Sequence, residues 1–127
     1  MSRILLVDDH EPVIISLQMM IEGMGHETLT ATTARQALTV QQTTPVDVLV
    51  TDIFMPDMDG YELIQKFRRD YPNVQVIAIS GGIPRAPSGP YLEVAEKMGA
   101  RWVLRKPFSP TQFIDIICQA TGEKSQN

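Results

Sequence analysis

The sequence predicts an α/β domain in which a five-stranded parallel sheet is covered by helices on both faces. Short apolar segments alternate along the chain with stretches whose apolar residues recur at helical spacing. Each connection between two apolar segments has room for a helix, which a crossover between parallel strands requires. Polar or charged residues directly follow four of the segments, and ligand sites of parallel sheets lie beyond the carboxyl ends of the strands.

Four of the predicted strands are short apolar runs bounded by turn residues, and the remaining one is a more polar segment. Such runs, apolar at nearly every position, are typical of strands that are buried on both faces of a sheet. The apolar runs are residues 4–7, 46–51, 74–79 and 102–104, and residues 27–31 are a plausible further short strand.

The predicted helices are marked at their starts by proline or by capping residues. Pro12 suits a first helical turn, and the segments 33–36 and 109–112 have the capping-box pattern. The segment 81–90 is rich in Gly and Pro and predicts a long loop. We expect helices to begin near residues 12, 33, 59, 91 and 109.

Length, charge and cysteine content exclude several classes of protein. The 127 residues suit one domain, and the net charge of −4 argues against a nucleic-acid partner. The single cysteine, Cys118, excludes an internal disulfide, fits a reducing compartment and is expected in the core. No run approaches the roughly 18 apolar residues of a membrane span, and the start does not read as a signal peptide. We therefore expect a cytoplasmic protein with no membrane partner.

Five polar side chains follow four of the predicted strands: Asp8 and Asp9, Asp52, Ser80, and Lys106. Because parallel strands end at one edge of the sheet, we expect these side chains to converge. Three carboxylates in one small site repel each other, and a hard divalent cation such as Mg²⁺ would compensate them. A phosphoryl group would complete the set, with Asp52 as the attacking oxygen and Lys106 neutralising charge.

Taken singly, each of these residues also has an ordinary structural explanation. The two acids after the first strand could cap a helix, Asp52 could be a turn residue, Ser80 a loop residue and Lys106 a solvated lysine. Their occurrence together at four strand ends favours the functional interpretation.

Four motifs make the chain similar to the receiver domain of bacterial two-component response regulators, over about residues 3–120. They are the segments ILLVDD at 4–9, DIFMPDMDG at 52–60, ISGG at 79–82 and KPF at 106–108. The resemblance implies a flavodoxin-like fold of the chemotaxis-receiver type with strand order 2-1-3-4-5. It also implies a receiver domain over residues 1–121, a polar tail over 122–127 and no output domain.

The resemblance further implies a magnesium site and a phosphoacceptor. Asp52 is expected to form an acyl phosphate with a phosphoryl group taken from a phosphohistidine. Asp9, Asp52 and the backbone carbonyl of Phe54 resemble direct Mg²⁺ ligands, and Asp8 resembles the acid that reaches the metal through water. Lys106-Pro107 resembles a peptide bond often found cis.

The implied function is signalling rather than enzymatic turnover. Ser80 resembles the switch hydroxyl and Lys106 the lysine that pairs with the phosphoryl group, so phosphorylation would shift the population toward an active arrangement. The expected partners are a histidine kinase or histidine phosphotransfer protein and a downstream protein that binds the fourth helix, fifth strand and fifth helix. The chain is expected to act alone, by docking a partner or by passing phosphate onward.

The chain departs from the family pattern before the lysine and in the segment between Ser80 and Lys106, which is longer than usual by about four residues. The family usually has Tyr or Phe three residues before the lysine, where this chain has Val103, with Trp102 beside it as a possible substitute or an ordinary core or edge tryptophan. Phe54 is bulky and apolar, and we expect it to shield the acyl phosphate from water. The long loop 81–90 is either a docking surface or a tolerated insertion.

Other classes of protein fit the residues less well. A dehalogenase-type phosphatase would have a second Asp where Phe54 stands, and a flavodoxin would have Ser, Thr and Gly after the first strand instead of acids. A receiver that never takes phosphate would not keep the complete set of site residues. His10 lies beside the acids, where it either modulates the site or is a solvated residue at the start of a helix.

Overall fold

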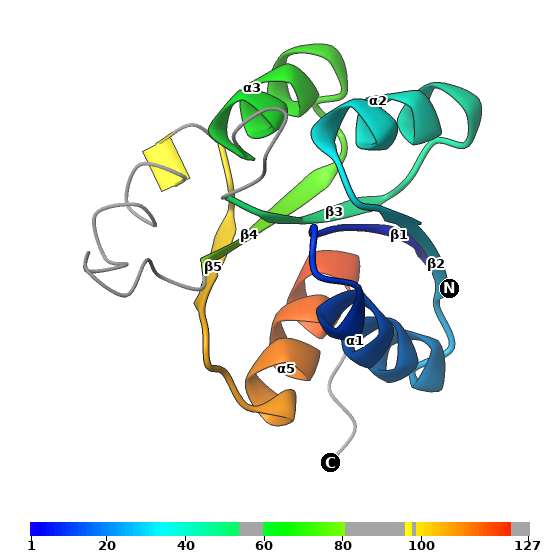
Figure 1. Cartoon of the computed structure of the whole chain (residues 1–127), viewed down its shortest axis with the longest axis vertical. Helices are drawn as coiled ribbons and strands as arrows, with labels where there is room; N and C mark the ends of the chain where they lie inside the picture. Colours follow the sequence, from blue (N-terminus) through cyan, green and yellow to red (C-terminus); the bar gives the residue numbers. More distant parts are fainter. Residues whose placement is uncertain (54–59, 81–95, 98, 123–127) are drawn as a thin grey trace.

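The computed structural model describes residues 1–53, 60–80, 96–97 and 99–122. It contains one five-stranded parallel sheet, with α1 and α5 on one face and α2 and α3 on the other (Figure 1). The strand order is β2-β1-β3-β4-β5, so the predicted fold class and strand order are confirmed.

The described strands and helices follow the predicted order. The strands are β1 (Arg3–Val7), β2 (Glu27–Ala31), β3 (Val48–Asp52), β4 (Gln75–Ser80) and β5 (Trp102–Arg105). The helices are α1 (Glu11–Gly23), α2 (Ala34–Thr43), α3 (Gly60–Asp70) and α5 (Pro110–Thr121). Of the helix predicted to begin near residue 91, Glu96 and Lys97 are helical, and the rest of that prediction lies outside the described residues.

Strands β3 and β4 begin later than predicted, for reasons visible in their hydrogen bonds. The backbone N–H of Val46 donates to the Gln41 side chain, and that of Val74 donates to the Tyr71 carbonyl, so both residues belong to the preceding turns. At their other ends β3 and β4 run one residue further than predicted and include Asp52 and Ser80. The ladder therefore extends into the residues predicted to form the site.

The core consists of two apolar clusters, one on each face of the sheet. Successive residues of the central strands point to opposite clusters, as Ile4 and Leu5 do in β1. Phe67 of α3 fills the first cluster and Phe113 of α5 the second, and both are fully buried. Cys118 is buried as well, as predicted. This double burial fixes where the strands end, and so positions the side chains that follow them.

The capping predictions hold at α5 and partly at α2. Ser109 and Gln112 form a complete capping box, with reciprocal bonds of 3.1 and 2.9 Å. At α2 the Thr33 hydroxyl accepts from the Gln36 N–H, but the Gln36 side chain accepts from Thr32 instead. Within the described part of the chain, no helix is long and apolar enough to cross a membrane.

Candidate functional site

The ends of β1 and β3 bring two carboxylates side by side. Val7 is in register with Thr51, so the next residues along the two strands, Asp8 and Asp52, stand level with each other. Both are buried, with 3% and 5% of their surface exposed, whereas the Asp9 side chain is 35% exposed. The two inner acids are held by the sheet, and the outer acid faces solvent.

The acids form a cluster that also contains His10. Asp8, Asp9, His10 and Asp52 each offer one oxygen or nitrogen atom, and these atoms all lie within 4.8 Å of one another. Sequence reasoning placed the three acids here but left the role of His10 open. The signal for His10 was its position directly after two acids, but only the bend between β1 and α1 turns its ring back toward them.

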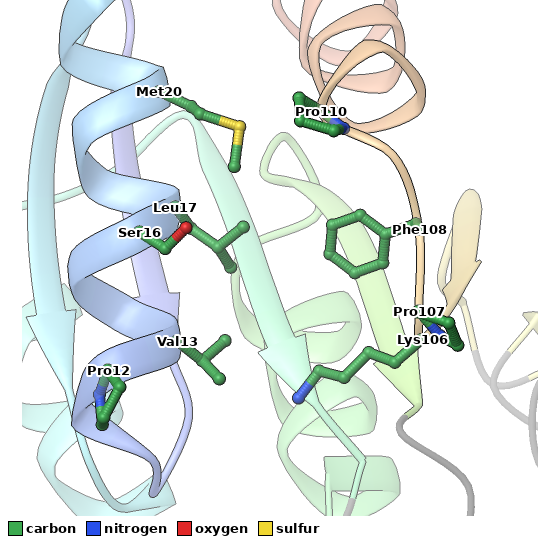
Figure 2. Close-up of a pocket in the computed structure, with 9 residues that line it drawn as sticks. All are labelled: Pro12, Val13, Ser16, Leu17, Met20, Lys106, Pro107, Phe108 and Pro110. Atoms are coloured by element: carbon green, nitrogen blue, oxygen red, sulfur yellow. The ribbon is translucent and has the colours of Figure 1, made fainter.

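Lys106 reaches this cluster from the other side. Its Nζ atom lies 3.1 Å from Asp8 Oδ2, to which it donates a hydrogen bond, and 3.6 Å from Asp52 Oδ2. Figure 2 shows the side chain extended from the segment between β5 and α5 toward the tip of β3. The Lys106 side chain as a whole is 22% exposed. The peptide bond from Lys106 to Pro107 is cis.

The charges of the cluster do not balance. Three carboxylates face one ammonium group and one imidazole, and two of the carboxylates are buried where water screens charge poorly. Carboxylate oxygens are the donors that a hard divalent cation prefers, and the exposed side chain of Asp9 leaves a route of entry. The donor set therefore fits a divalent cation such as Mg²⁺.

Ser80 ends β4 next to the site. It is fully buried, and its carbonyl accepts a 2.8 Å hydrogen bond from the Lys106 N–H, which ties the ends of β4 and β5 together. Asp52 is in register with Ile79, one residue before Ser80. Phe54, predicted to offer its carbonyl, lies outside the described residues, as does the loop 81–90.

The structure separates Trp102 from the position where the family usually has an aromatic residue. Val103 packs on the cluster beneath α2 and α3, and Trp102 on the cluster beneath α1 and α5. The Trp102 indole N–H donates to Gln119 Oε1 at 3.1 Å, and the Arg101 guanidinium lies 5.0 Å from the ring centroid. Since the two residues face opposite sides of the sheet, Trp102 is an edge tryptophan and does not substitute at Val103.

Gly60 is a second residue whose role the sequence did not reveal. Its N–H donates to the Ile53 carbonyl at 2.6 Å, and a Cβ atom there would lie 2.5 Å from both the Asp52 carbonyl oxygen and Ile53 Cα. No side chain fits at this distance. A glycine as the first residue of a helix was the available signal, but the close approach depends on how α3 packs against the end of β3.

An apolar groove of about 590 Å³ adjoins the site. It lies between α1 and the segment after β5, and the stem of Lys106 forms part of its wall (Figure 2). Two apolar side chains of α1 that do not line the groove, Ile15 and Met19, are 56% and 70% exposed. The residues that line the groove are Pro12, Val13, Ser16, Leu17, Met20, Lys106, Pro107, Phe108 and Pro110.

Comparisons with known proteins point to one family. The sequence model of the response regulator receiver domain matches residues 4–118. The response regulator SaeR of Staphylococcus aureus (strain USA300) is 25% identical over 114 residues, which are 90% of this chain and 48% of SaeR. The chain thus spans about half the length of the curated relatives it matches.

Solved structures agree with the family match. A CheY-like response regulator receiver domain protein from Methanospirillum hungatei JF-1 superposes with a TM-score of 0.84 at 27% identity, covering 94% of this chain and 92% of that one. The beryllofluoride-activated NtrC4 receiver domain, a dimer in solution, superposes with a TM-score of 0.83 at 35% identity, covering 93% and 94%.

Proposed function

The chain belongs to the response regulator receiver family, and we propose that Asp52 accepts a phosphoryl group from a protein donor. Phosphorylation of Asp52 then switches the docking of a downstream protein partner. The observation that carries the proposal is the position of Asp52. It is the last residue of the central strand β3, buried beside two further acids and 3.6 Å from the Lys106 ammonium group.

The proposed reaction is an in-line transfer to a carboxylate. An Asp52 oxygen attacks the phosphorus of a phosphohistidine, the P–N bond breaks, and an acyl phosphate forms on Asp52 while the donor histidine leaves with the electron pair. Asp9, Asp52 and the Phe54 carbonyl would hold Mg²⁺ directly, and Asp8 through water. The ion, when bound, supplies positive charge that offsets the charge of the transferring group.

Lys106 and Ser80 would both bind the new phosphoryl group. Lys106 pairs with Asp8 and Asp52 in this structure, and a phosphoryl group on Asp52 gives its ammonium group additional acceptors. Ser80 stands at the end of β4, directly before the loop 81–90, and a bond from its hydroxyl to the phosphoryl group would pull on that loop. The surface of the fourth helix, β5 and α5 is then the proposed partner face.

The groove beside the site supports a protein as the phosphoryl donor. A donor histidine must approach the open side of the Asp52 cluster, and a protein that carries it would cover the adjoining groove. We expect Ser16→Lys, at an exposed residue that lines the groove, to slow transfer from a histidine kinase by about tenfold or more, because buried charge disfavours the complex. Transfer from acetyl phosphate, which needs no protein surface, serves as the control and should not change.

The test of the phosphoacceptor is intact mass after incubation with acetyl phosphate and Mg²⁺. We expect the wild type to gain one phosphoryl group and Asp52→Asn to gain none. Asp47→Asn, which removes an exposed aspartate before the start of the same strand, is the matched control and should be labelled like the wild type. Equal labelling of Asp52→Asn, or a wild type that takes no phosphoryl group from acetyl phosphate or from any kinase of a panel, would refute the proposal.

The lifetime of the phosphoryl group and its fate complete the proposal. We expect the bulky Phe54 to slow hydrolysis, so a half-life of seconds would count against this role. We also expect a cytoplasmic protein with no catalytic turnover of phosphate esters. Transfer from the labelled chain to a histidine phosphotransfer protein would identify a relay, and labelled chain that keeps its phosphate in that mixture would identify a terminal effector.

A further inference from the structure

We propose that the imidazole of His10 is a nitrogen ligand of the cation bound at this site. The nitrogen would raise the affinity for late first-row ions such as Ni²⁺, relative to that for Mg²⁺, above the ratio that the carboxylates alone would give. This inference deepens the proposed function, because it concerns the same cation site and rests on it.

The position of the His10 ring is the first observation. His10 is the residue before α1, in extended conformation, and its ring makes no capping bond to the described residues of that helix. Its backbone N–H donates to Asp8 Oδ1 at 2.9 Å. That bond turns the residue back over the acids, and its ring Nδ1 lies 3.2 Å from Asp8 Oδ1 and 3.0 Å from Asp9 Oδ1.

The spacing of these atoms suits neighbouring ligands of one ion. Two ligand atoms about 2.1 Å from a small divalent ion and at right angles to each other are about 3.0 Å apart. The distance from His10 Nδ1 to Oδ1 of Asp9, a proposed direct ligand, matches this value, and Asp52, the other carboxylate ligand, offers an oxygen within 4.8 Å of both. The same distances also fit a hydrogen bond from a protonated Nδ1 to the acids, so the competing explanation is that the ring donates to them in every state.

Access and ligand chemistry favour the metal. The ammonium group of Lys106 occupies the inner side of the cluster, against Asp8 and Asp52, whereas Asp9 and His10 stand on the outer side with 35% and 67% of their side chains exposed. An ion entering from solvent meets Asp9 and His10 first. Imidazole is a good ligand for Ni²⁺, Co²⁺ and Zn²⁺, whereas Mg²⁺ prefers oxygen donors. An added nitrogen therefore changes the ratio of affinities more than it changes Mg²⁺ binding itself.

Pulsed EPR of Mn²⁺ bound to the full chain tests the contact directly. The chain has two histidines. The second, His26, is buried before β2 at the opposite edge of the sheet, where its Nδ1 accepts from the Ser2 N–H. An imidazole ¹⁴N coupling to Mn²⁺ at this site therefore reports His10. We expect the coupling in the wild type and its loss in His10→Ala, with Mn²⁺ still bound.

Calorimetric titration with Ni²⁺ and with Mg²⁺ tests the preference. We expect His10→Ala to weaken Ni²⁺ binding by about tenfold or more and Mg²⁺ binding by less than about twofold. Glu11→Ala, which removes the next exposed side chain along the chain, is the matched control and should leave the ratio unchanged. Equal losses for both ions, or a wild-type spectrum without nitrogen coupling, would overturn the inference.

The outcomes separate this inference from the proposed function. If Mg²⁺ binds and supports labelling of Asp52 while no nitrogen coupling is seen, the role of His10 alone is refuted. If neither ion binds and Asp52 is not labelled, the proposed function fails and the inference fails with it.

Discussion

The parallel strands begin on one side of the sheet, called the amino edge here, and end on the opposite side, the carboxyl edge. Each of these two edges holds one basic residue between two acids, but the consequences differ. At the amino edge, Arg3 donates its backbone N–H to Asp47 at 2.8 Å and its Nε to Glu27 at 3.2 Å. At the carboxyl edge, the Lys106 ammonium group lies 3.1 Å from Asp8 and 3.6 Å from Asp52.

Burial is the difference between the two edges. The Arg3 and Glu27 side chains are 37% and 43% exposed, whereas those of Asp8 and Asp52 are 5% and 6% exposed. Water screens the amino-edge charges, so that ion pair contributes little to stability. The carboxyl-edge charges are poorly screened and outnumber their basic partner once Asp9 is counted, so a divalent cation would compensate them. Similar charges therefore hold segments of the chain together at the amino edge and form a candidate cation site at the carboxyl edge.

The largest expected effect on stability concerns the backbone that carries the carboxyl edge. A Cβ atom at Gly60 would lie 2.5 Å from backbone atoms of Asp52 and Ile53, which cannot move aside as a flexible side chain could. We expect Gly60→Ala to lower the free energy of unfolding by about 3 kcal/mol, because the end of β3 must shift. Urea denaturation followed by circular dichroism measures the change.

Gly23 provides the matched control for this substitution. It is the last residue of α1, and a Cβ atom added there would meet no neighbouring atom within 4 Å. We expect Gly23→Ala to leave stability unchanged or raise it by up to about 1 kcal/mol. Similar losses in both variants would show that the approach of α3 to the end of β3 is not a special constraint.

Cation binding should stabilise the carboxyl edge alone. We expect Mg²⁺ at 100 times its dissociation constant to raise the free energy of unfolding by about 2.7 kcal/mol. The double variant Asp8→Asn and Asp9→Asn should lose this gain, and the amino-edge double variant Glu27→Gln and Asp47→Asn should keep it. Thermal unfolding with and without Mg²⁺ is the measurement, and an equal gain in both variants would place the cation elsewhere.

Replacing the basic residue at each edge should lower the free energy of unfolding by unequal amounts. In the presence of a chelator, we expect Lys106→Met to cost about 2 kcal/mol, because it leaves the carboxylates of Asp8 and Asp52 without their ammonium partner. Arg3→Met should cost less than about 1 kcal/mol, because its charges are solvated. Added Mg²⁺ should restore most of the loss in Lys106→Met and none in Arg3→Met. A larger loss at Arg3 would contradict the role assigned to burial.

The smallest expected effect concerns a fully exposed ion pair in α3. A bidentate pair of hydrogen bonds from Arg69, at 2.9 and 3.1 Å, holds the pKa of the Asp70 carboxyl below its usual value. A lowered pKa in the folded state favours folding above the unfolded pKa, and this contribution is lost as the pH falls through the folded pKa. We expect Arg69→Ala to raise the pKa of Asp70 in an NMR titration with no resolvable change in unfolding free energy, and an unchanged pKa would contradict the pairing.

Local sequence patterns predicted the parts of this protein that depend on neighbouring residues. Apolar runs marked the strands, because a strand buried on both faces must be apolar at nearly every position. The capping box at Ser109 could be predicted because its partner, Gln112, is only three residues away in the sequence. Asp8, Asp9, Asp52 and Lys106 were assigned to one site because the ends of parallel strands meet at a common edge.

The sequence by itself determined the order of elements, the fold class and the edge of the sheet at which the charged side chains gather. The tertiary structure decided that Trp102 faces α5, on the opposite side of the sheet from Val103. It also decided that Gly60 lies against the Asp52 backbone and that the His10 ring turns toward the acids. These three features arise from the packing of helices and from a bend between elements. Contacts of that kind depend on distances between segments that no local pattern of residues specifies.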